Sequence, residues 1–181
     1  MHRLAFVTII FAFFCNALVA VAQPVAPPKE PRPLGESTGY PLPRFVSLGA
    51  DPANARTGPG QRYPIKWVYV RRGLPLQVVG EYDTWRQVRD RDGEEGWIHR
   101  ALLSGTRTAV VTAKDGISLY GEPQGGSEPI AHLGQRVLVK LGQCALDWCA
   151  VEGLARGDEG DFDGWVKREA LWGLYADEVL E

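Results

Sequence analysis

The chain has 181 residues and a formal net charge of −2 at pH 7, which leaves room for one ordinary domain or two small ones. Its hydrophobic content of 45% excludes a wholly disordered chain. The balanced charge does not indicate nucleic-acid binding, because domains that bind nucleic acids are usually strongly basic. The combination of 21 Gly, 13 Pro and 6 Trp is typical of short β-strands joined by tight turns.

Residues 1–22 are predicted to form a signal peptide. His2-Arg3 gives a short polar start, an apolar run extends from Leu4 to Phe14, and Ala20-Val21-Ala22 provides the small-x-small pattern that signal peptidase accepts. Cleavage after this pattern gives a secreted or periplasmic protein without membrane contact. The alternative is an uncleaved anchor, because the apolar stretch approaches the ~20 residues that span a bilayer.

Residues 23–43 are predicted to form a proline-rich linker, since repeated prolines favour an extended, semi-rigid polyproline chain. The prolines of this segment are Pro24, Pro27, Pro28, Pro31, Pro33, Pro41 and Pro43. Two P-x-x-P segments among them have the form that eukaryotic SH3 domains bind. We favour the simpler interpretation, in which the linker separates the folded part from a membrane or a wall.

An internal repeat fills the rest of the chain, with one copy over residues 44–105, a second over 106–176 and a short tail at 177–181. The copies share motifs in the same order: Thr84-Trp85-Arg86-Gln87-Val88 with Asp147-Trp148-Cys149-Ala150-Val151, Gly96-Trp97-Ile98 with Gly164-Trp165-Val166, and Ala101-Leu102 with Ala170-Leu171. Each copy has about 60 residues, which is too long for a solenoid repeat. Each copy is therefore predicted to be a small domain of its own.

Both copies carry the pattern of an all-β fold. In the first copy, Leu76 and Val78 alternate with polar residues, and Asp92-Gly93 suits a hairpin turn with positive φ. In the second copy, residues 137–141 have the same strand pattern. No stretch shows a long helical period, although residues 168–174 have room for one helical or 3₁₀ turn.

The opening of the first copy resembles a known family signature. Residues 54–60, Asn-Ala-Arg-Thr-Gly-Pro-Gly, resemble the Asn-Val-Arg-x-Gly-Pro signature of bacterial SH3-like domains. The second copy departs from it, because residues 118–123 keep the proline and lack the Asn and the Arg. The Cys144…Trp148-Cys149 and Leu171-Trp172-Gly173 motifs are similar to those of a proteobacterial subfamily of exported SH3-like proteins. The resemblance implies an all-β fold of two tandem small SH3-like β-barrels.

Cys144 and Cys149 are predicted to form a disulfide bond across a hairpin turn, in keeping with export. The alternatives are a metal site and a redox pair. A zinc site needs about four ligands, and the mature chain offers only His99 and His132 as histidines. A thioredoxin-type site has two residues between its cysteines, whereas this pair has four. We therefore expect no metal and no cofactor.

No catalytic residue is predicted, and the protein is not expected to be an enzyme. A wall cysteine peptidase needs a free Cys near a His, whereas both mature cysteines are predicted to be paired. His99 is interpreted as an outward strand residue and His132 as a strand or turn residue. The acidic segment at residues 158–163 has carboxylates of the type that bind Ca²⁺. It lacks the twelve-residue loop with its closing Glu, so we favour a solvated acidic loop.

The aromatic residues divide between core and candidate site. Trp97 and Trp165, each between a Gly and a β-branched residue, are expected to pack against their barrels. The binding site is predicted in the first copy, which keeps the family opening and has aromatic and arginine side chains that suit a peptide or sugar. The candidate residues are Arg56, Arg62, Tyr63, Trp67, Tyr69 and Trp85. The alternative is that Arg56 only braces the turn at residues 58–60 and the aromatic rings only fill the core.

Two classes of function follow from the sequence. The family resemblance, the predicted export and the linker favour a non-catalytic binding module of the cell envelope that recognises peptidoglycan peptide or another wall component. The alternative is a protein–protein scaffold, such as an accessory subunit or an inhibitor of an envelope enzyme. The expected partner is a cell-wall polymer or an envelope protein, and no nucleic acid is expected.

Overall fold

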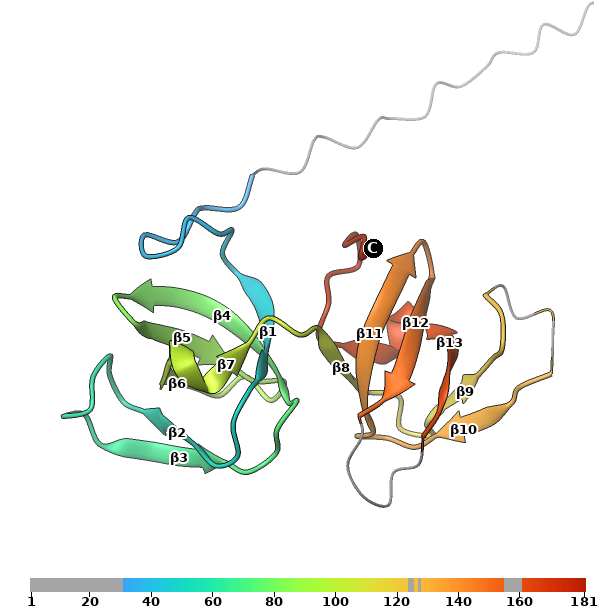
Figure 1. Ribbon diagram of the computed structural model, residues 1–181, viewed down its shortest axis with the longest axis horizontal. Coiled ribbons are helices and arrows are strands. Elements are labelled where there is room, and N and C mark those ends of the chain that lie inside the picture. The colour runs from blue at the N-terminus through green and yellow to red at the C-terminus, as the bar shows by residue number, and fades with distance from the viewer. Residues whose placement is uncertain (1–30, 124–125, 127, 155–160) are drawn as a thin grey trace, which may run out of the picture. The chain divides into compact units, whose positions relative to one another are not determined.

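The computed structural model describes residues 31–123, 126, 128–154 and 161–181, and Figure 1 shows their fold. The predicted signal peptide and residues 23–30 of the predicted linker lie outside the described residues. Residues 155–160, which include the start of the acidic segment, lie outside them as well. Across the described ranges, no helix is both long and apolar enough to cross a membrane.

The first copy forms a seven-stranded antiparallel sheet that curls into a small barrel (Figure 1). The order of neighbouring strands is β3-β2-β6-β5-β4-β1-β7. One 3₁₀ turn, η1 (Arg100–Leu102), lies between β6 and β7 along the chain. The strands are β1 (Arg44–Leu48), β2 (Ala53–Arg56), β3 (Ile65–Tyr69), β4 (Pro75–Tyr82), β5 (Trp85–Arg89), β6 (Glu95–His99) and β7 (Leu103–Ser104).

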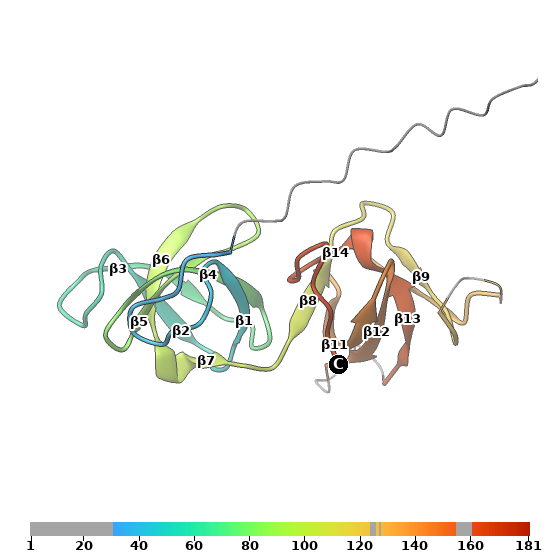
Figure 2. The same ribbon diagram turned by 90° about the horizontal axis from the view of Figure 1, so that it is seen from above.

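The second copy has a five-stranded sheet in the order β13-β12-β11-β8-β14, whose strands are labelled in Figure 2, and a two-stranded hairpin of β9 and β10, which Figure 1 labels. A bridge between Tyr120 and Trp165 connects the hairpin to the sheet. The predicted turn after residue 167 is the 3₁₀ turn η3 (Arg168–Ala170). The strands are β8 (Thr108–Val111), β9 (Ile117–Leu119), β10 (Ala131–Leu133), β11 (Leu138–Ala145), β12 (Trp148–Gly153), β13 (Asp163–Lys167) and β14 (Leu171–Trp172).

Alternation along each strand gives each barrel its own core. In β5, Val88 turns inward and is fully buried, whereas Trp85 and Gln87 turn outward and stay half-buried. The first core consists of Leu48, Ala53, Ala55, Tyr69, Leu76, Val78, Val88 and Ile98. The second core is centred on Ala109, Val111, Leu119, Val139, Cys144, Cys149, Val151 and Val166. The predicted all-β fold with two tandem barrels is confirmed.

The expected packing of Trp97 and Trp165 is wrong. In β6 and β13 the inward position belongs to the next residue, so Ile98 and Val166 are fully buried while both Trp rings stay half-buried on the outer face. Successive residues of a strand point to opposite faces. A Gly-Trp-Ile motif therefore places either the Trp or the Ile inside, and here the β-branched residue takes that place.

Residues of the two copies also contact each other directly. The hydroxyl Oγ1 of Thr108 donates to the carbonyl of Gly73 at 2.7 Å and lies 2.6 Å from Oγ of Ser47. The ring of Phe45 meets the ring of Trp172 edge-on, with 5.2 Å between centroids. The first residue of β8 is thus buried against residues of the preceding barrel, and its hydroxyl hydrogen is used in the bond to Gly73.

The predicted disulfide bond between Cys144 and Cys149 is present, and both residues are fully buried. It closes the hairpin of β11 and β12. The C-terminal tail is attached to the same place: the amide of Cys144 donates to the carbonyl of Leu180 at 2.9 Å, and the amide of Leu180 returns a bond of 3.1 Å. The tail therefore adds a short bridge to the edge of the second barrel.

Residues 32–43, named here the strap, differ from the predicted extended linker. The strap folds back on itself, because Leu34 bridges Pro41 and the amide of Leu42 donates to the carbonyl of Pro33 at 2.8 Å. The turn is completed by a 2.8 Å bond from the amide of Gly35 to the carbonyl of Tyr40. Local proline preference is overridden here by contacts with the first barrel.

The carboxylate of Glu81 in β4 holds the strap. It accepts bonds from the amide of Ser37 at 3.1 Å, and from the amide and hydroxyl of Thr38 at 3.0 and 2.8 Å. Two arginines complete the cluster: Arg44 donates to it at 2.7 Å and Nε of Arg86 lies 3.5 Å away. The Glu81 side chain is only 1% exposed, so this buried charge is offset by hydrogen bonds and by two cations.

Acid should weaken this attachment. Burial raises the pKa of Glu81, but hydrogen bonds from Thr38 and Arg44 outweigh burial and hold the pKa below its ordinary value. A carboxyl group whose pKa is lower in the folded than in the unfolded protein stabilises the fold when it is ionised. This stabilisation is complete above the unfolded pKa of about 4.3 and is lost as the pH falls through the folded pKa.

We therefore expect the free energy of unfolding to change little from neutral pH to about pH 5 and to decrease below about pH 4. Urea denaturation of the wild type and of Glu81→Gln over this range measures the contribution. The gap between the two proteins should close in acid. A gap that stays constant would show that the Glu81 charge does not stabilise the fold.

Candidate functional site

The outer face of β2, β6 and β5 brings together residues that lie far apart in the sequence. Cross-strand pairing places Trp85 opposite His99 and Gln87 opposite Trp97, and Arg56 is paired with Trp97 from the other side. Side chains directly opposite each other on one face of an antiparallel sheet are in contact distance. This face therefore carries two Trp rings, an imidazole and a guanidinium group.

A hollow of about 230 Å³ opens on this face of the first barrel. The rings of Trp85 and His99 meet edge-on in it, with 5.4 Å between centroids. Nδ1 of His99 accepts a bond from the amide of Ala101 at 3.3 Å, which fixes the imidazole at the start of η1. The lining residues are Asn54, Arg56, Gln61, Trp85, His99 and Leu102.

Two of the predicted site residues, Arg56 and Trp85, lie in this hollow. Arg56 also braces the loop above it, because Nη1 donates to the carbonyls of Gln61 at 3.1 Å and Tyr63 at 2.8 Å. The alternative structural role considered for Arg56 is thus real, and it coexists with a position in the hollow. The guanidinium group is held in place by the loop that it shapes.

Arg62 and Tyr63 form the tip of the opening loop and do not line the hollow. The guanidinium group of Arg62 lies over the Tyr63 ring at 5.2 Å, and Nη2 donates to the Tyr63 hydroxyl at 3.3 Å. The Tyr63 ring packs on the backbone of Gly58, where an added Cβ would lie 2.5 Å from Cδ1 of the ring. The family Gly-Pro motif therefore makes space for this aromatic side chain.

Trp67 and Tyr69 belong to the interior of the barrel. They lie two residues apart on β3 and face the same side, with their rings edge-on at 6.1 Å. The Tyr69 hydroxyl donates to Asp90 at 3.2 Å. Burial, followed by the nearby charge of Asp90, raises the pKa of Tyr69 above its usual range. Tyr69 contributes to the core, and neither ring lines the hollow.

Four of the lining residues are not among those predicted from the sequence: Asn54, Gln61, His99 and Leu102. His99 was interpreted as an outward residue, which is correct, but it was not connected with Trp85. The available signal was strand parity: in a strand that starts at Glu95, residues 95, 97 and 99 share one face. The pairing with Trp85 depends on the register of β5 and β6, which the sequence does not reveal.

The same face of the second barrel is covered. Trp148 corresponds to Trp85 in the repeat, but it is only 8% exposed. The Tyr120 ring meets it edge-on at 5.4 Å, and Nζ of Lys167 lies 4.4 Å from its centroid. Aligning residues 55–59 of the first copy with residues 119–123 of the second places Tyr120 at the position of Arg56. A bulky ring thus fills the place that in the first barrel stays open.

The hollow presents ring surface and polar side chains on the outer face of the first barrel. Among the described residues, no group of three His, Cys, Asp or Glu side chains has the geometry to hold a metal ion. Both cysteines of the described part form the disulfide, and Nε2 of His132 lies 2.8 Å from the carbonyl of Asp115. The open hollow offers aromatic surface and polar side chains that suit an amide-rich ligand.

Comparison with protein families gives two matches along the chain. The family model described as the bacterial SH3 domain matches residues 49–105 and again residues 113–173. The chain belongs to the bacterial SH3 domain family. The two matches cover most of the two barrels, so each barrel is one bacterial SH3 domain. The predicted family and its tandem arrangement are confirmed.

Other comparisons add little to this assignment. A comparison with curated proteins finds no match. Among solved structures, the chain is similar to NlpC2 from Trichomonas vaginalis, at 16% identity and a TM-score of 0.31 over 74% of this chain and 49% of that one. NlpC1 from the same organism gives 14% identity and a TM-score of 0.30 over 76% of this chain and 48% of that one. The chain spans about half the length of these structures.

Proposed function

We propose that this protein is a non-catalytic binding module of the cell envelope and that the first SH3 domain recognises peptidoglycan peptide or another wall component. The observation that carries the proposal is the open hollow at Trp85 and His99, which the second domain has filled with Tyr120. Membership of the bacterial SH3 family and the predicted signal peptide support a location outside the cytoplasm.

The chemistry of the hollow suits a short peptide. The exposed part of the Trp85 ring offers a flat apolar surface for small aliphatic side chains. The amides of Asn54 and Gln61 offer donors and acceptors to a peptide backbone. Arg56 adds a fixed positive charge for a carboxylate. Arg62, at the tip of the loop, is placed to approach a carboxylate further along the same ligand.

Co-sedimentation with purified sacculi tests this function. We expect the wild type to sediment with the sacculi, and Trp85→Ala to lose at least about tenfold in affinity, since aromatic anchors commonly carry ~2 kcal/mol or more of binding free energy. Tyr40→Ala is the matched control, because Tyr40 is an exposed aromatic residue of the strap outside the hollow.

Thermal unfolding of both variants must accompany the binding assay. Equal binding by the wild type and by a folded Trp85→Ala variant would remove the hollow from the function. A wild type that does not sediment at all, in the absence of other proteins, would contradict wall binding itself.

The scaffold alternative also has an observation in its favour. Strand β3 lies at the edge of the first sheet, and Ile65 and Val68 are exposed on it, as is Val70 just beyond. Exposed apolar residues on a free edge strand are typical of a surface that pairs with another chain. If sacculi do not bind, capture from an envelope extract by the wild type and by Val68→Lys will test this edge. The lysine variant should then lose the captured protein.

A further inference from the structure

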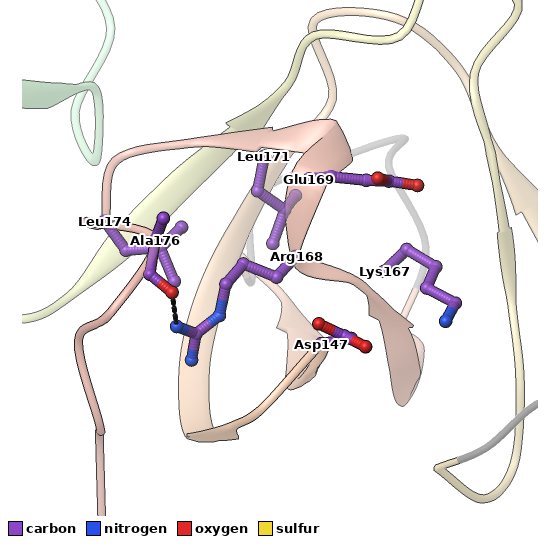
Figure 3. A pocket seen from close by; sticks show the side chains of 7 residues that line it. All are labelled: Asp147, Lys167, Arg168, Glu169, Leu171, Leu174 and Ala176. Carbon is purple, nitrogen blue, oxygen red and sulfur yellow. Dashed lines mark hydrogen bonds between the residues drawn. The ribbon is translucent and has the colours of Figure 1, made fainter. Parts of the chain in front are cut away.

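A second hollow, of about 440 Å³, lies in the second SH3 domain and belongs to neither site considered above. Its volume falls within the range of about 300–1,000 Å³ that is usual for small-molecule sites. Its walls come from the β11–β12 turn, from β13 with η3, and from the segment after β14 (Figure 3). The lining residues are Asp147, Lys167, Arg168, Glu169, Leu171, Leu174 and Ala176.

The three walls are fastened to one another around Arg168, which is 9% exposed. Its amide donates to the carbonyl of Asp147 at 2.9 Å. Its guanidinium group donates to the carbonyl of Ala176 and, at 2.8 Å, to that of Glu178. The disulfide closes the hairpin that carries Asp147. The backbone walls of the hollow and the Arg168 guanidinium group are therefore held in place by the fold itself.

Both signs of charge line the hollow without neutralising each other. In the view of Figure 3, the Asp147 carboxylate lies between the side chains of Arg168 and Lys167, and Glu169 extends from η3. Within the described part of the chain, no salt bridge joins Asp147 or Glu169 to either cation. The two carboxylates are left for solvent or for a ligand, and the Lys167 ammonium group, which lies over the Trp148 ring, still has hydrogen-bond donors to offer.

This pattern selects one chemical class. A simple anion would meet the carboxylates of Asp147 and Glu169, and a divalent cation would meet Lys167 and Arg168, so each would be repelled by half of the lining. A ligand with one ammonium group and one carboxylate satisfies both halves with charge-assisted hydrogen bonds. Leu171, Leu174 and Ala176 supply an apolar wall for a short aliphatic side chain.

We propose that the second SH3 domain binds a short zwitterionic peptide in this hollow, with the ammonium group toward Asp147 and Glu169 and the carboxylate toward Lys167. Such a ligand is a free dipeptide with two possible sources, cleavage of a protein chain and cleavage of a wall peptide, which differ in the configuration of their residues. The site is independent of the one around Trp85, so each can be tested without the other.

NMR titration of the exported chain with alanyl-alanine, in its L,L and D,D forms, is the decisive experiment. We expect at least one form to bind with a dissociation constant of about 1 mM or tighter, with the largest amide shifts at Asp147, Lys167 and Glu169. A preference for the D,D form identifies a peptide released from the wall, and a preference for the L,L form identifies a peptide released from a protein. Absence of binding by both forms overturns the proposal.

Modified probes and variants establish the mode of binding. N-acetyl-alanyl-alanine lacks the ammonium group and alanyl-alanine amide lacks the carboxylate, and each should bind about tenfold more weakly or worse. Asp147→Asn should have a similar effect and still fold, because only the carbonyl of Asp147 takes part in the structural bond to Arg168. Equal affinity for the blocked and unblocked peptides would overturn the proposal.

Two controls separate this site from its surroundings. Asp163→Asn removes an exposed carboxylate from the same strand that ends at Lys167, outside the hollow, and should leave the affinity unchanged. Trp85→Ala should also bind the dipeptide as the wild type does. If Trp85→Ala alone abolished dipeptide binding, the ligand would belong to the first domain and the second site would be ruled out.

Discussion

Replacing Glu81 by alanine is expected to lower the free energy of unfolding by about 3–5 kcal/mol, because breaking a buried ion pair leaves an uncompensated charge. The variant leaves Arg44 and Arg86 without their shared carboxylate, and Arg86 is only 4% exposed. It also removes the acceptor for Ser37 and Thr38, so the strap should detach. Urea denaturation measures the first effect and amide hydrogen exchange in the strap measures the second.

A matched pair of controls shows which part of the effect is electrostatic. Glu81→Gln keeps an acceptor for Thr38 and removes only the charge, so its stability should fall between those of the wild type and the alanine variant. Glu94→Ala breaks an exposed ion pair, in which the side chain of Glu94 is 62% exposed and that of Lys66 is 43% exposed. Exposed pairs of this kind contribute about 0–1 kcal/mol to the free energy of unfolding. Equal losses for the alanine variants at positions 81 and 94 would refute the proposed role of the Glu81 cluster.

The repeat made the fold predictable from the sequence. Glycine-bounded strands recur in the same order in both copies, and Gly96-Trp97-Ile98 and Gly164-Trp165-Val166 do become corresponding strands. The pairing of Cys144 with Cys149 followed from their spacing across a turn. Each of these features depends on residues that are close together in the sequence, and the strand motifs occur twice. Prediction from sequence is most reliable for such short-range patterns.

The strap was not predictable, because its attachment is long-range. The three prolines of the strap favour an extended chain locally, yet the acceptor for Thr38 is Glu81, which lies 43 residues further along the chain. From the sequence alone, an acidic residue such as Glu81 in a β-strand is expected to be solvated. The residues next to it in the sequence do not indicate that two arginines from other strands surround it. Only the folded barrel brings these groups together.

The candidate site was predicted in part for a similar reason. Arg56 and Trp85 were named, and the structure places both in the hollow. Trp67 and Tyr69 were named with them, although strand parity puts them on the core side of β3. Shifting a strand by one residue exchanges its faces, so an aromatic residue in a short strand is assigned to core or surface only when the register is known.

Removing the disulfide should be the largest change in the second domain. We expect the double variant Cys144→Ala/Cys149→Ala to lose about 2–5 kcal/mol of stability, the usual range for a native disulfide in a small domain. Closure of this short loop accounts for roughly 2 kcal/mol in the chain-entropy account. Truncating two fully buried side chains leaves a cavity, which adds to the loss.

The loss should be confined to the second domain and should reach the C-terminal tail. Cys144 exchanges two backbone bonds with Leu180, so loosening the hairpin removes the tail's attachment. Amide hydrogen exchange should therefore accelerate in β11, β12 and the tail, and change far less in β4 and β5.

Dithiothreitol should reproduce the pattern in the wild type and have no effect on the double variant. A wild type whose exchange is unchanged by reduction would show that the crosslink does not stabilise this domain. Because Asp147 lies on the closed hairpin, reduction should also weaken dipeptide binding in the second hollow.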